Sequence, residues 1–190
     1  QANPWTVVEL EGAGKRGEFV FASARSLRAI AVDPGSRLYA ADASGQIYIV
    51  LLNGGGMTSG GSFTGGDSPA KVAVDPVTHQ VYVTNFGSST VKVFSANGQA
   101  LKSYDVLKGP TGIAIDEIGR KAYVADTLAN SYSIIDLRGE TVENSLPVGT
   151  VNTGLAFDRV SRRLYAANLT GNLVSVIDPA RAEAPFALPD

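Results

Sequence analysis

Short runs of large apolar residues, separated by polar turns, follow one another along the whole chain. In one stretch the runs cover residues 72–74, 81–83 and 90–94, with a weaker run near 101–106. Large and small side chains alternate in these runs with a period of two, which is typical of β-strands. No segment shows a long 3.6-residue periodicity, so we predict short strands joined by tight turns and no long helix.

This strand pattern repeats four times. The segments 30–42, 72–85, 113–126 and 155–168 read IAVDPGSRLYAAD, VAVDPVTHQVYVTN, IAIDEIGRKAYVAD and LAFDRVSRRLYAAN. Their shared aspartates are 42, 41 and 42 residues apart, and their shared tyrosines keep the same rhythm. The aspartates are Asp33, Asp75, Asp116 and Asp158, and the tyrosines are Tyr39, Tyr82, Tyr123 and Tyr165. A period of about 40 to 45 residues matches one four-stranded blade of a β-propeller.

We therefore expect an all-β fold, a β-propeller with about four to five four-stranded blades in this chain. The prediction is a single domain over residues 1–190, with repeats near 29–70, 71–111, 112–153 and 154–190. Residues 1–28 hold two further candidate strands, at 6–10 and 18–22. We expect these to be the outer strands of an incomplete blade.

The number of blades leaves three arrangements open. The chain is part of a larger ring, or two chains complete one ring of about eight blades. In the third arrangement the ring closes with four or five blades, and the N-terminal strands complete the last sheet. An open arc exposes the apolar faces of its end blades, and repeat arrays need capped ends to stay soluble. We therefore expect a homo-oligomer unless the ring closes.

Small residues mark one face of the first strand in each repeat. Alanine stands two positions before each shared aspartate, between large apolar neighbours. These alanines are Ala31, Ala73, Ala114 and Ala156. Successive residues of a strand face opposite sides. The large neighbours are therefore expected to pack between sheets, and the alanines to face the crowded central channel.

The second strands carry a family motif. Residues 82–85 read Tyr-Val-Thr-Asn, and the other copies read Tyr-Ala-Ala-Asp, Tyr-Val-Ala-Asp and Tyr-Ala-Ala-Asn. The Ser-Ile-Ile-Asp of 133–136, the Ser-Val-Ile-Asp of 175–178 and the Leu-Pro-Val-Gly of 146–149 fit the same pattern. Over residues 28–190 the chain resembles the YVTN-type β-propeller repeat family, which is related to NHL-repeat propellers. The resemblance is specific for the fold and nearly silent on function.

The resemblance also implies a location. YVTN-type propellers resemble this chain in repeat pattern and belong to exported bacterial or archaeal proteins. The chain begins at Gln1 rather than at Met, as removal of an export signal would leave it, with an engineered truncation as the alternative. We therefore expect a periplasmic, secreted or cell-surface protein.

Composition excludes several classes of function. The 190 residues include 16 Lys and Arg, 18 Asp and Glu, and no cysteine. Without cysteine there is no disulfide, thiolate nucleophile or Cys-based metal site. The even charge balance, with no basic cluster, argues against nucleic acid as a partner. The longest apolar run, residues 47–52, is too short to cross a bilayer, so no membrane insertion is expected.

The repeated aspartates invite a calcium site, because oxygen ligands suit that ion. Each aspartate, however, precedes a turn in its own blade, where it caps the turn through the backbone. Four separate blades also place the four carboxylates too far apart to share one ion. We predict no metal site and no cofactor, with calcium as the alternative. A second set, predicted to form turns as well, ends the second strands: Asp42, Asn85, Asp126 and Asn168.

Two further features are predicted to carry no chemistry. His79 is the only histidine and lies in a turn, so a catalytic triad or a histidine metal site lacks candidates. This argues against the amidating lyases among NHL propellers, whose metal site uses several histidines. The stretch 53–66, NGGGMTSGGSFTGG, lacks the Lys-Ser or Lys-Thr of a phosphate loop. We expect it to be a flexible loop between the third and fourth strands of the first blade.

Binding residues are expected where loops lead into the inner strands, because these loops converge at the mouth of the channel. Their side chains mix both charges with hydroxyl and amide groups, which suits a polar ligand or a peptide. The candidate ligand-binding residues are Arg25, Arg28, Asp67, Lys71, Lys108, Thr111 and Asn152, with Ser26, Ser68 and Thr153 beside them. No residue is singled out as catalytic.

These features favour a non-catalytic scaffold that presents a polar rim to a protein, peptide or carbohydrate ligand. One alternative is an enzyme or enzyme subunit with its site at the channel mouth. It would be a metal-dependent hydrolase or lyase, or a subunit of a quinone-linked dehydrogenase, in which YVTN-type propellers occur. The other alternative is a structural surface-layer or adhesion module, which needs no pocket.

Overall fold

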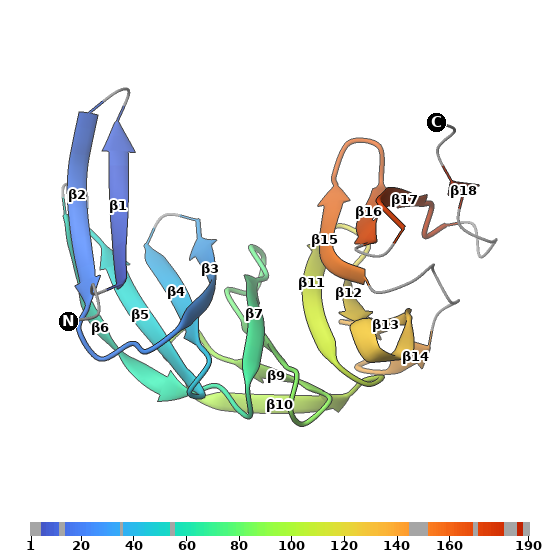
Figure 1. The fold of residues 1–190 in the computed structure, drawn as a ribbon, viewed down its shortest axis with the longest axis horizontal. Helices are drawn as coiled ribbons and strands as arrows, with labels where there is room; N and C mark the ends of the chain where they lie inside the picture. The colour runs from blue at the N-terminus through green and yellow to red at the C-terminus, as the bar shows by residue number, and fades with distance from the viewer. Residues whose placement is uncertain are drawn as a thin grey trace.

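The computed structural model describes residues 5–11, 14–34, 36–53, 56–144, 152–168, 171–180 and 186–187. In these residues four antiparallel four-stranded sheets follow one another along the chain, and a two-stranded hairpin precedes them. We call the four sheets blades 1 to 4. They form an open arc, with the N-terminal hairpin at one end and blade 4 at the other (Figure 1). The expected all-β propeller architecture is confirmed.

Each blade contains four strands in chain order, from the inner to the outer edge. The hairpin consists of β1 (Trp5–Glu11) and β2 (Gly14–Phe21). Blade 1 contains β3 (Leu27–Asp33), β4 (Arg37–Asp42), β5 (Gln46–Leu52) and β6 (Met57–Thr64). Blade 2 contains β7 (Pro69–Val74), β8 (Val81–Asn85), β9 (Thr90–Phe94) and β10 (Ala100–Asp105). Blade 3 contains β11 (Pro110–Asp116), β12 (Lys121–Asp126), the single turn η1 (Thr127–Ala129), β13 (Ser131–Asp136) and β14 (Val142–Asn144). Blade 4 contains β15 (Asn152–Asp158), β16 (Arg163–Asn168), β17 (Leu173–Ile177) and β18 (Phe186–Ala187). No helix of the described residues is long and apolar enough to cross a membrane.

The glycine-rich stretch 53–66 is mostly a strand, so the expected flexible loop is wrong. Its residues form β6, which pairs with β5 from Gln46 opposite Thr64 to Leu52 opposite Met57. Gly60 lies so close to β5 that a Cβ there would meet the Ile49 Cγ2 at 2.8 Å. Glycine inside a strand permits such a close approach, and this is its role here.

Successive blades pack face to face through apolar side chains. Tyr39 of blade 1 is fully buried, in one cluster with Val83 and Phe94 of blade 2. Ala31 lies directly opposite Tyr39 on the paired strand and packs against the same cluster, as Ala73 does in the next interface. The expectation that the alanines face the channel is therefore wrong. Ala31, Ala73 and Ala114 face the next blade, and they are small because the cross-strand tyrosine fills that face.

A charged contact joins the blades at the turn between their first and second strands. The shared aspartate of each of the first three blades binds a basic side chain from the following blade. We call these pairs the latches: His79–Asp33 (Nδ1 to Oδ1, 2.7 Å), Arg120–Asp75 (Nη2 to Oδ2, 2.8 Å) and Arg162–Asp116. The aspartates also cap their own turns, as Asp75 does by accepting from the Val77 N–H (3.1 Å) and the Thr78 hydroxyl (2.6 Å). The turn caps were expected, whereas the bonds between blades were not.

The three latch residues that contact the aspartates share an unusual backbone conformation. His79, Arg120 and Arg162 have φ values of 57°, 56° and 59°. A side chain other than glycine is uncommon in this left-handed region. The backbone of this turn is therefore strained, and the bond to the aspartate of the preceding blade offsets the strain.

The two ends of the arc are open. The hairpin β1–β2 remains a separate two-stranded sheet. It packs beside the outer strands of blade 1, where Phe21 is buried with Leu38 and Val50. Blade 4 takes its fourth strand from its own β18, and among the described strands neither strand of the hairpin pairs with it. The arrangement in which the N-terminal strands complete the last sheet is therefore wrong.

Candidate functional site at the channel mouth

Two kinds of loop lie along one edge of the arc. Loops 22–26, 65–68 and 106–109 lead into the inner strands β3, β7 and β11, and turns 43–45, 86–89 and 127–130 follow the second strands. Backbone hydrogen bonds join loop and turn in the same way in three blades. The bonds run from Ala43 N–H to Ser26 O (2.9 Å), from Phe86 N–H to Ser68 O (3.1 Å) and from Thr127 N–H to Gly109 O (2.9 Å). We call this edge the mouth, because the inner strands begin here.

Every inner strand begins with a β-bulge at the mouth. The pairing between first and second strands skips one residue in each blade: Arg28, Ala70, Thr111 and Thr153. A bulge re-aims a side chain and is common beside functional sites. Two of the predicted ligand-binding residues, Arg28 and Thr111, occupy these positions. Arg28 is exposed, and the Thr111 hydroxyl lies 2.5 Å from the Thr127 hydroxyl.

The remaining predicted residues lie along the same edge. Arg25, Asp67 and Lys108 have exposed side chains on the three loops that lead into β3, β7 and β11. Lys71 is exposed just after the bulge of β7. Asn152 begins β15, and its side chain is outside the described part of the chain. The structure thus spaces these residues one blade apart along a rim.

The rim is held in place by the residue that ends each second strand, and Asp42 shows the simplest case. Its Oδ2 accepts from the N–H groups of Arg25 and Ser26 (2.8 Å each), and its Oδ1 accepts from the Ser44 N–H (2.8 Å). Burial opposes ionisation, but these hydrogen bonds outweigh burial and lower the pKa of Asp42 below its ordinary value. An ionised carboxylate therefore fastens loop 22–26 to turn 43–45.

Asp126 occupies the same position in blade 3 with poorer partners. Its Oδ2 accepts from the Ser133 hydroxyl (2.7 Å), which in turn accepts from the Leu107 N–H (3.1 Å). Its Oδ1 is buried without a hydrogen-bond partner. Burial raises the pKa of Asp126 to about 7, and the few hydrogen bonds only partly oppose this. Protonated and ionised forms are therefore both populated near neutral pH.

Asparagine stands at this position in blades 2 and 4. Asn85 donates through Nδ2 to Gly65 O (3.2 Å) and Val83 O (3.3 Å), and Asn168 donates to the Ser175 hydroxyl (2.7 Å). The Oδ1 of each is buried without a partner, as in Asp126. The sequence predicted a turn residue at all four positions. It gave no sign that three of them would bury an unsatisfied oxygen, because burial depends on the neighbouring loop.

Two exposed apolar side chains on the rim were missed by sequence reasoning. Phe86 directly follows β8, and Leu128 lies in η1; their exposed fractions are 36% and 63%. Leu128 lies over Gly109, where a Cβ would meet the Leu128 Cγ at 2.6 Å. The available signal was a large apolar residue within two positions of the Asp or Asn that ends the second strand.

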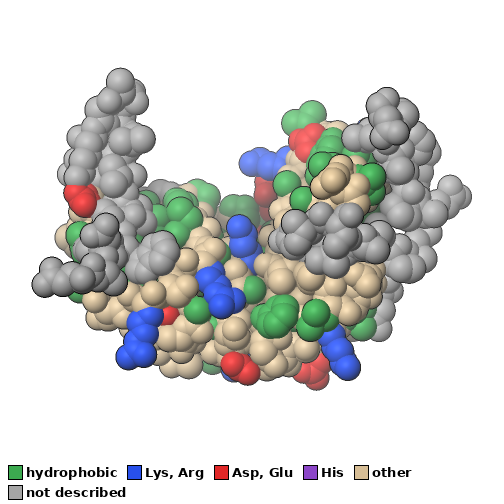
Figure 2. All heavy atoms as spheres, in the orientation of Figure 1, with side chains coloured by type: hydrophobic (Ala, Val, Ile, Leu, Met, Phe, Trp, Pro, Cys, Tyr) green, Lys and Arg blue, Asp and Glu red, His purple; other side chains and the backbone are tan. Residues whose placement is uncertain are grey.

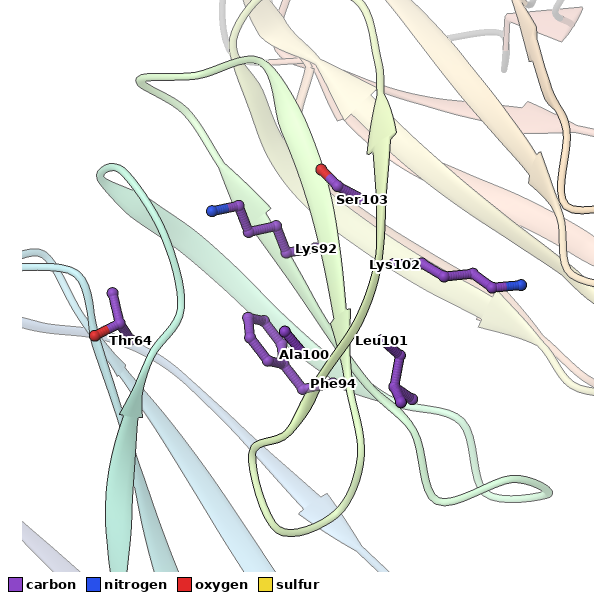
Figure 3. A pocket seen from close by; sticks show the side chains of 7 residues that line it. All are labelled: Thr64, Lys92, Phe94, Ala100, Leu101, Lys102 and Ser103. Carbon is purple, nitrogen blue, oxygen red and sulfur yellow. The ribbon is translucent and has the colours of Figure 1, made fainter.

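A separate groove of about 390 Å³ lies on the outer strands, away from the inner ones. Thr64 of β6 lines one side, and β9 and β10 supply the rest (Figure 3). The lining residues are Thr64, Lys92, Phe94, Ala100, Leu101, Lys102 and Ser103. Phe94 forms part of the floor and packs against Phe63, with ring centroids 4.6 Å apart. None of the predicted ligand-binding residues lines this groove.

Within the described part of the chain, no group of three or more His, Asp or Glu side chains is placed to hold a metal ion. The latches explain why the repeated aspartates do not converge. The carboxylates of Asp33, Asp75 and Asp116 each bind a basic residue of the following blade, and Asp158 caps its own turn, at the edge opposite the mouth.

No protein-family model and no curated protein matches the sequence. Solved structures with the same fold do match. A chain in the crystal structure of a nidogen/laminin complex is 20% identical, with a TM-score of 0.75; the match covers 97% of this chain and 74% of that one. A chain of Kuenenia stuttgartiensis hydrazine synthase is 22% identical, with a TM-score of 0.76; the match covers 88% of this chain and half of that one. Both are β-propellers, and at this identity the likeness concerns the fold alone.

Proposed function

We propose that the chain is a non-catalytic binding module that holds another protein, or an extended peptide from one, at its mouth. The observation that carries this proposal is the composition of the rim, where exposed Phe86 and Leu128 lie among the charged Asp67 and Lys108. Apolar side chains within a polar surround are typical of protein interfaces. The hydrogen bonds beneath the rim fix its loops in advance, which lowers the entropy cost of binding.

The similar structures support a protein ligand, because one of them belongs to a complex named for two proteins, nidogen and laminin. We also propose the finer features that the sequence suggests. The repeat is of YVTN type, the protein is bacterial or archaeal and acts outside the cytoplasm, and it needs no resident cofactor. A carbohydrate is the alternative ligand for the same rim.

An enzyme subunit is the second candidate function, because the other similar structure is part of an enzyme. One observation favours it: the pKa of Asp126, about 7, suits a proton-transfer group. Asp126 and Ser133 are, however, fully buried, so a substrate could not touch them in this conformation. A structural role for this pair therefore ranks ahead of a catalytic one.

The test uses the intact chain and a random peptide library displayed on phage. We expect Leu128→Ser to weaken selected peptides about tenfold, since loss of an apolar anchor at an interface costs about 1 to 2 kcal/mol. Leu101→Ser is the matched control, because Leu101 is 43% exposed on β10, away from the mouth. Affinities would be measured by biolayer interferometry on variants with unchanged thermal unfolding.

Two results would contradict the proposal. One is a set of peptides that lose affinity with Leu101→Ser and keep it with Leu128→Ser, which would place binding on the outer strands. The other is failure of a folded protein to select any peptide while a glycan array yields a ligand. That second result would replace the protein ligand by a carbohydrate.

A further inference from the structure

The shared aspartate forms a latch in blades 1 to 3, whereas the described residues show no latch in blade 4. In the first three blades the shared aspartate is almost fully buried, with exposed fractions of 2%, 0% and 3% for the Asp33, Asp75 and Asp116 side chains. The fourth aspartate, Asp158, is only partly covered. It accepts from the Val160 N–H (3.0 Å) and the Ser161 N–H and hydroxyl (3.2 and 2.6 Å), all within its own turn. Among the described residues no basic side chain from another blade reaches it.

The apolar face of blade 4 is open in the same way. In blade 1 this face contains Ala41 and Ile47, which lie opposite each other and are fully buried against blade 2. Their counterparts in blade 4 are Ala167 and Val174, which pair in the same register. Ala167 is exposed and Val174 is 46% exposed. The exposed atoms belong to a face that is covered wherever a further blade follows it.

The three internal interfaces show what chemistry covers such a face. The following blade contributes large residues of its inner strand, such as Val72 at 2% exposed and Ile113 at 5% exposed. It also contributes the latch cation from its first turn. Each cation is 45 or 46 residues from its aspartate, one repeat further along the chain.

A second copy of the chain fits this face poorly. Blade 1 presents Ile30 and Val32, which are 51% and 53% exposed. Its first turn, however, has only five residues between Asp33 and Tyr39, against six between Asp75 and Tyr82, and its basic residue, Arg37, begins β4 and donates to Asn97 Oδ1 of blade 2 (3.2 Å). The hairpin β1–β2 also packs on the outer strands of the same side of blade 1.

We propose that the open face of blade 4 binds one further sheet of this same repeat pattern, whose first turn carries an arginine or histidine that pairs with Asp158. Figure 2 shows hydrophobic side chains at the end of the arc that β15 and β16 form, at the upper right. The partner's inner strand covers the apolar face, and its cation completes the fourth latch. This proposal does not depend on the mouth and stands apart from the proposed function.

The test uses the intact chain and a probe made from its own third repeat. The probe is the β11–β12 hairpin, residues 110–126, synthesised as a cyclic peptide so that the strands are already paired, and labelled for fluorescence anisotropy. We expect saturable binding. Changing the latch cation in the probe, Arg120→Gln, should weaken it about tenfold, a typical value for a charge-assisted hydrogen bond that becomes buried.

A double-mutant cycle isolates the latch. Asp158→Asn in the protein should weaken the unchanged probe about tenfold and leave the Arg120→Gln probe unaffected. Val174→Asp should abolish binding of both probes. Asp136→Asn is the matched control, because Asp136 likewise accepts from groups of its own turn, the N–H groups of Arg138 (2.7 Å) and Gly139 (3.0 Å). This variant should leave binding unchanged.

Three outcomes would overturn the proposal. Equal affinity of both probes for the wild-type protein would show that no latch forms. Absence of binding to a folded monomer would show that the face does not take this partner. The third outcome is a dimer in light scattering that Val174→Asp dissociates and that the probe does not. It would show that a second copy of the chain covers the face.

Discussion

At the latch edge, pairs of a carboxylate and a basic side chain join neighbouring blades, whereas at the mouth hydrogen bonds from N–H and O–H groups join the loop and the turn of a blade. Burial raises the pKa of Asp75, but the hydrogen bonds from Arg120, Thr78 and Val77 and the charge of Arg120 together outweigh burial, so the pKa is lowered. Asp126 at the mouth accepts from the Ser133 hydroxyl, and burial raises its pKa to about 7. The ionised form is thus stabilised in Asp75 and destabilised in Asp126, whereas Asp42 at the mouth stays ionised because three N–H groups donate to it.

This difference indicates a division of roles between the edges. At the latch edge Asp75 and Asp116 are paired with arginines of the next blade, so these contacts serve the stability of the arc. The mouth buries three acceptor oxygens without donors, in Asn85, Asp126 and Asn168. Native proteins tolerate such unsatisfied groups chiefly where a fold carries its function.

The largest expected effect at a single pH comes from breaking the buried latch Arg120–Asp75. Asp75→Ala leaves Arg120 only 16% exposed and without its carboxylate. Removing one partner of a buried ion pair costs about 3 kcal/mol of the free energy of unfolding. Urea unfolding followed by circular dichroism would measure this loss, with Asp136→Ala as a control at an exposed turn. A loss no larger than that of the control would show that the latch adds nothing.

The next effect is a pH dependence with opposite sign at the two edges. The folded-state pKa of Asp126 is about 7, against an ordinary value of 3.8, so the unfolded chain loses this proton first. Stability from this group is full below about pH 4 and is lost as the pH rises to 7, by up to about tenfold in the unfolding constant per pH unit. Asp75 behaves in the opposite way, because its lowered pKa makes stability fall only in acid.

Asp126→Asn isolates the contribution of the mouth. The variant places in blade 3 the amide that blades 2 and 4 already have, and it should flatten the profile between pH 5 and pH 7. Urea midpoints at these two pH values would measure the effect. Identical midpoints for the wild type at both pH values would show that Asp126 does not titrate as described.

The smallest effect compares two latches. The His79 side chain is 54% exposed beside Asp33, so solvent screens this pair far more than Arg120–Asp75. Exposed ion pairs contribute about 0.2 to 1 kcal/mol, and His79→Ala should cost no more than that in the same urea experiment. A cost equal to that of Asp75→Ala would mean that backbone position, rather than burial, decides the strength of a latch.

Much of the fold could be read from the sequence because its signals are local. Alternation over a few residues predicted the strands, and the spacing of Asp33, Asp75, Asp116 and Asp158 predicted the blades. The prediction that stretch 53–66 is a flexible loop was wrong because its conformation depends on a neighbouring strand. Its composition is that of a loop, but β5 offers it a strand edge and a close-packed surface.

Only part of the candidate site could be predicted from the sequence. The loops that lead into the inner strands do lie on one edge, as their order in the repeat predicted. Phe86 and Leu128 were missed because exposure depends on what packs above a residue. The role of Asp126 was missed because its repeat position looks the same as that of Asp42, and only the number of N–H donors nearby separates the two.

By itself, the sequence determined the all-β blades and their order, since strand pairing within a blade joins neighbours in the chain and follows the local pattern of apolar residues. Only the tertiary structure decided which carboxylates are paired, which are strained and which face is left open. Those outcomes depend on residues 45 or 46 positions away and on the burial that one blade imposes on the next. Burial and charge pairing are properties of the packed arc, and a repeat in isolation has neither.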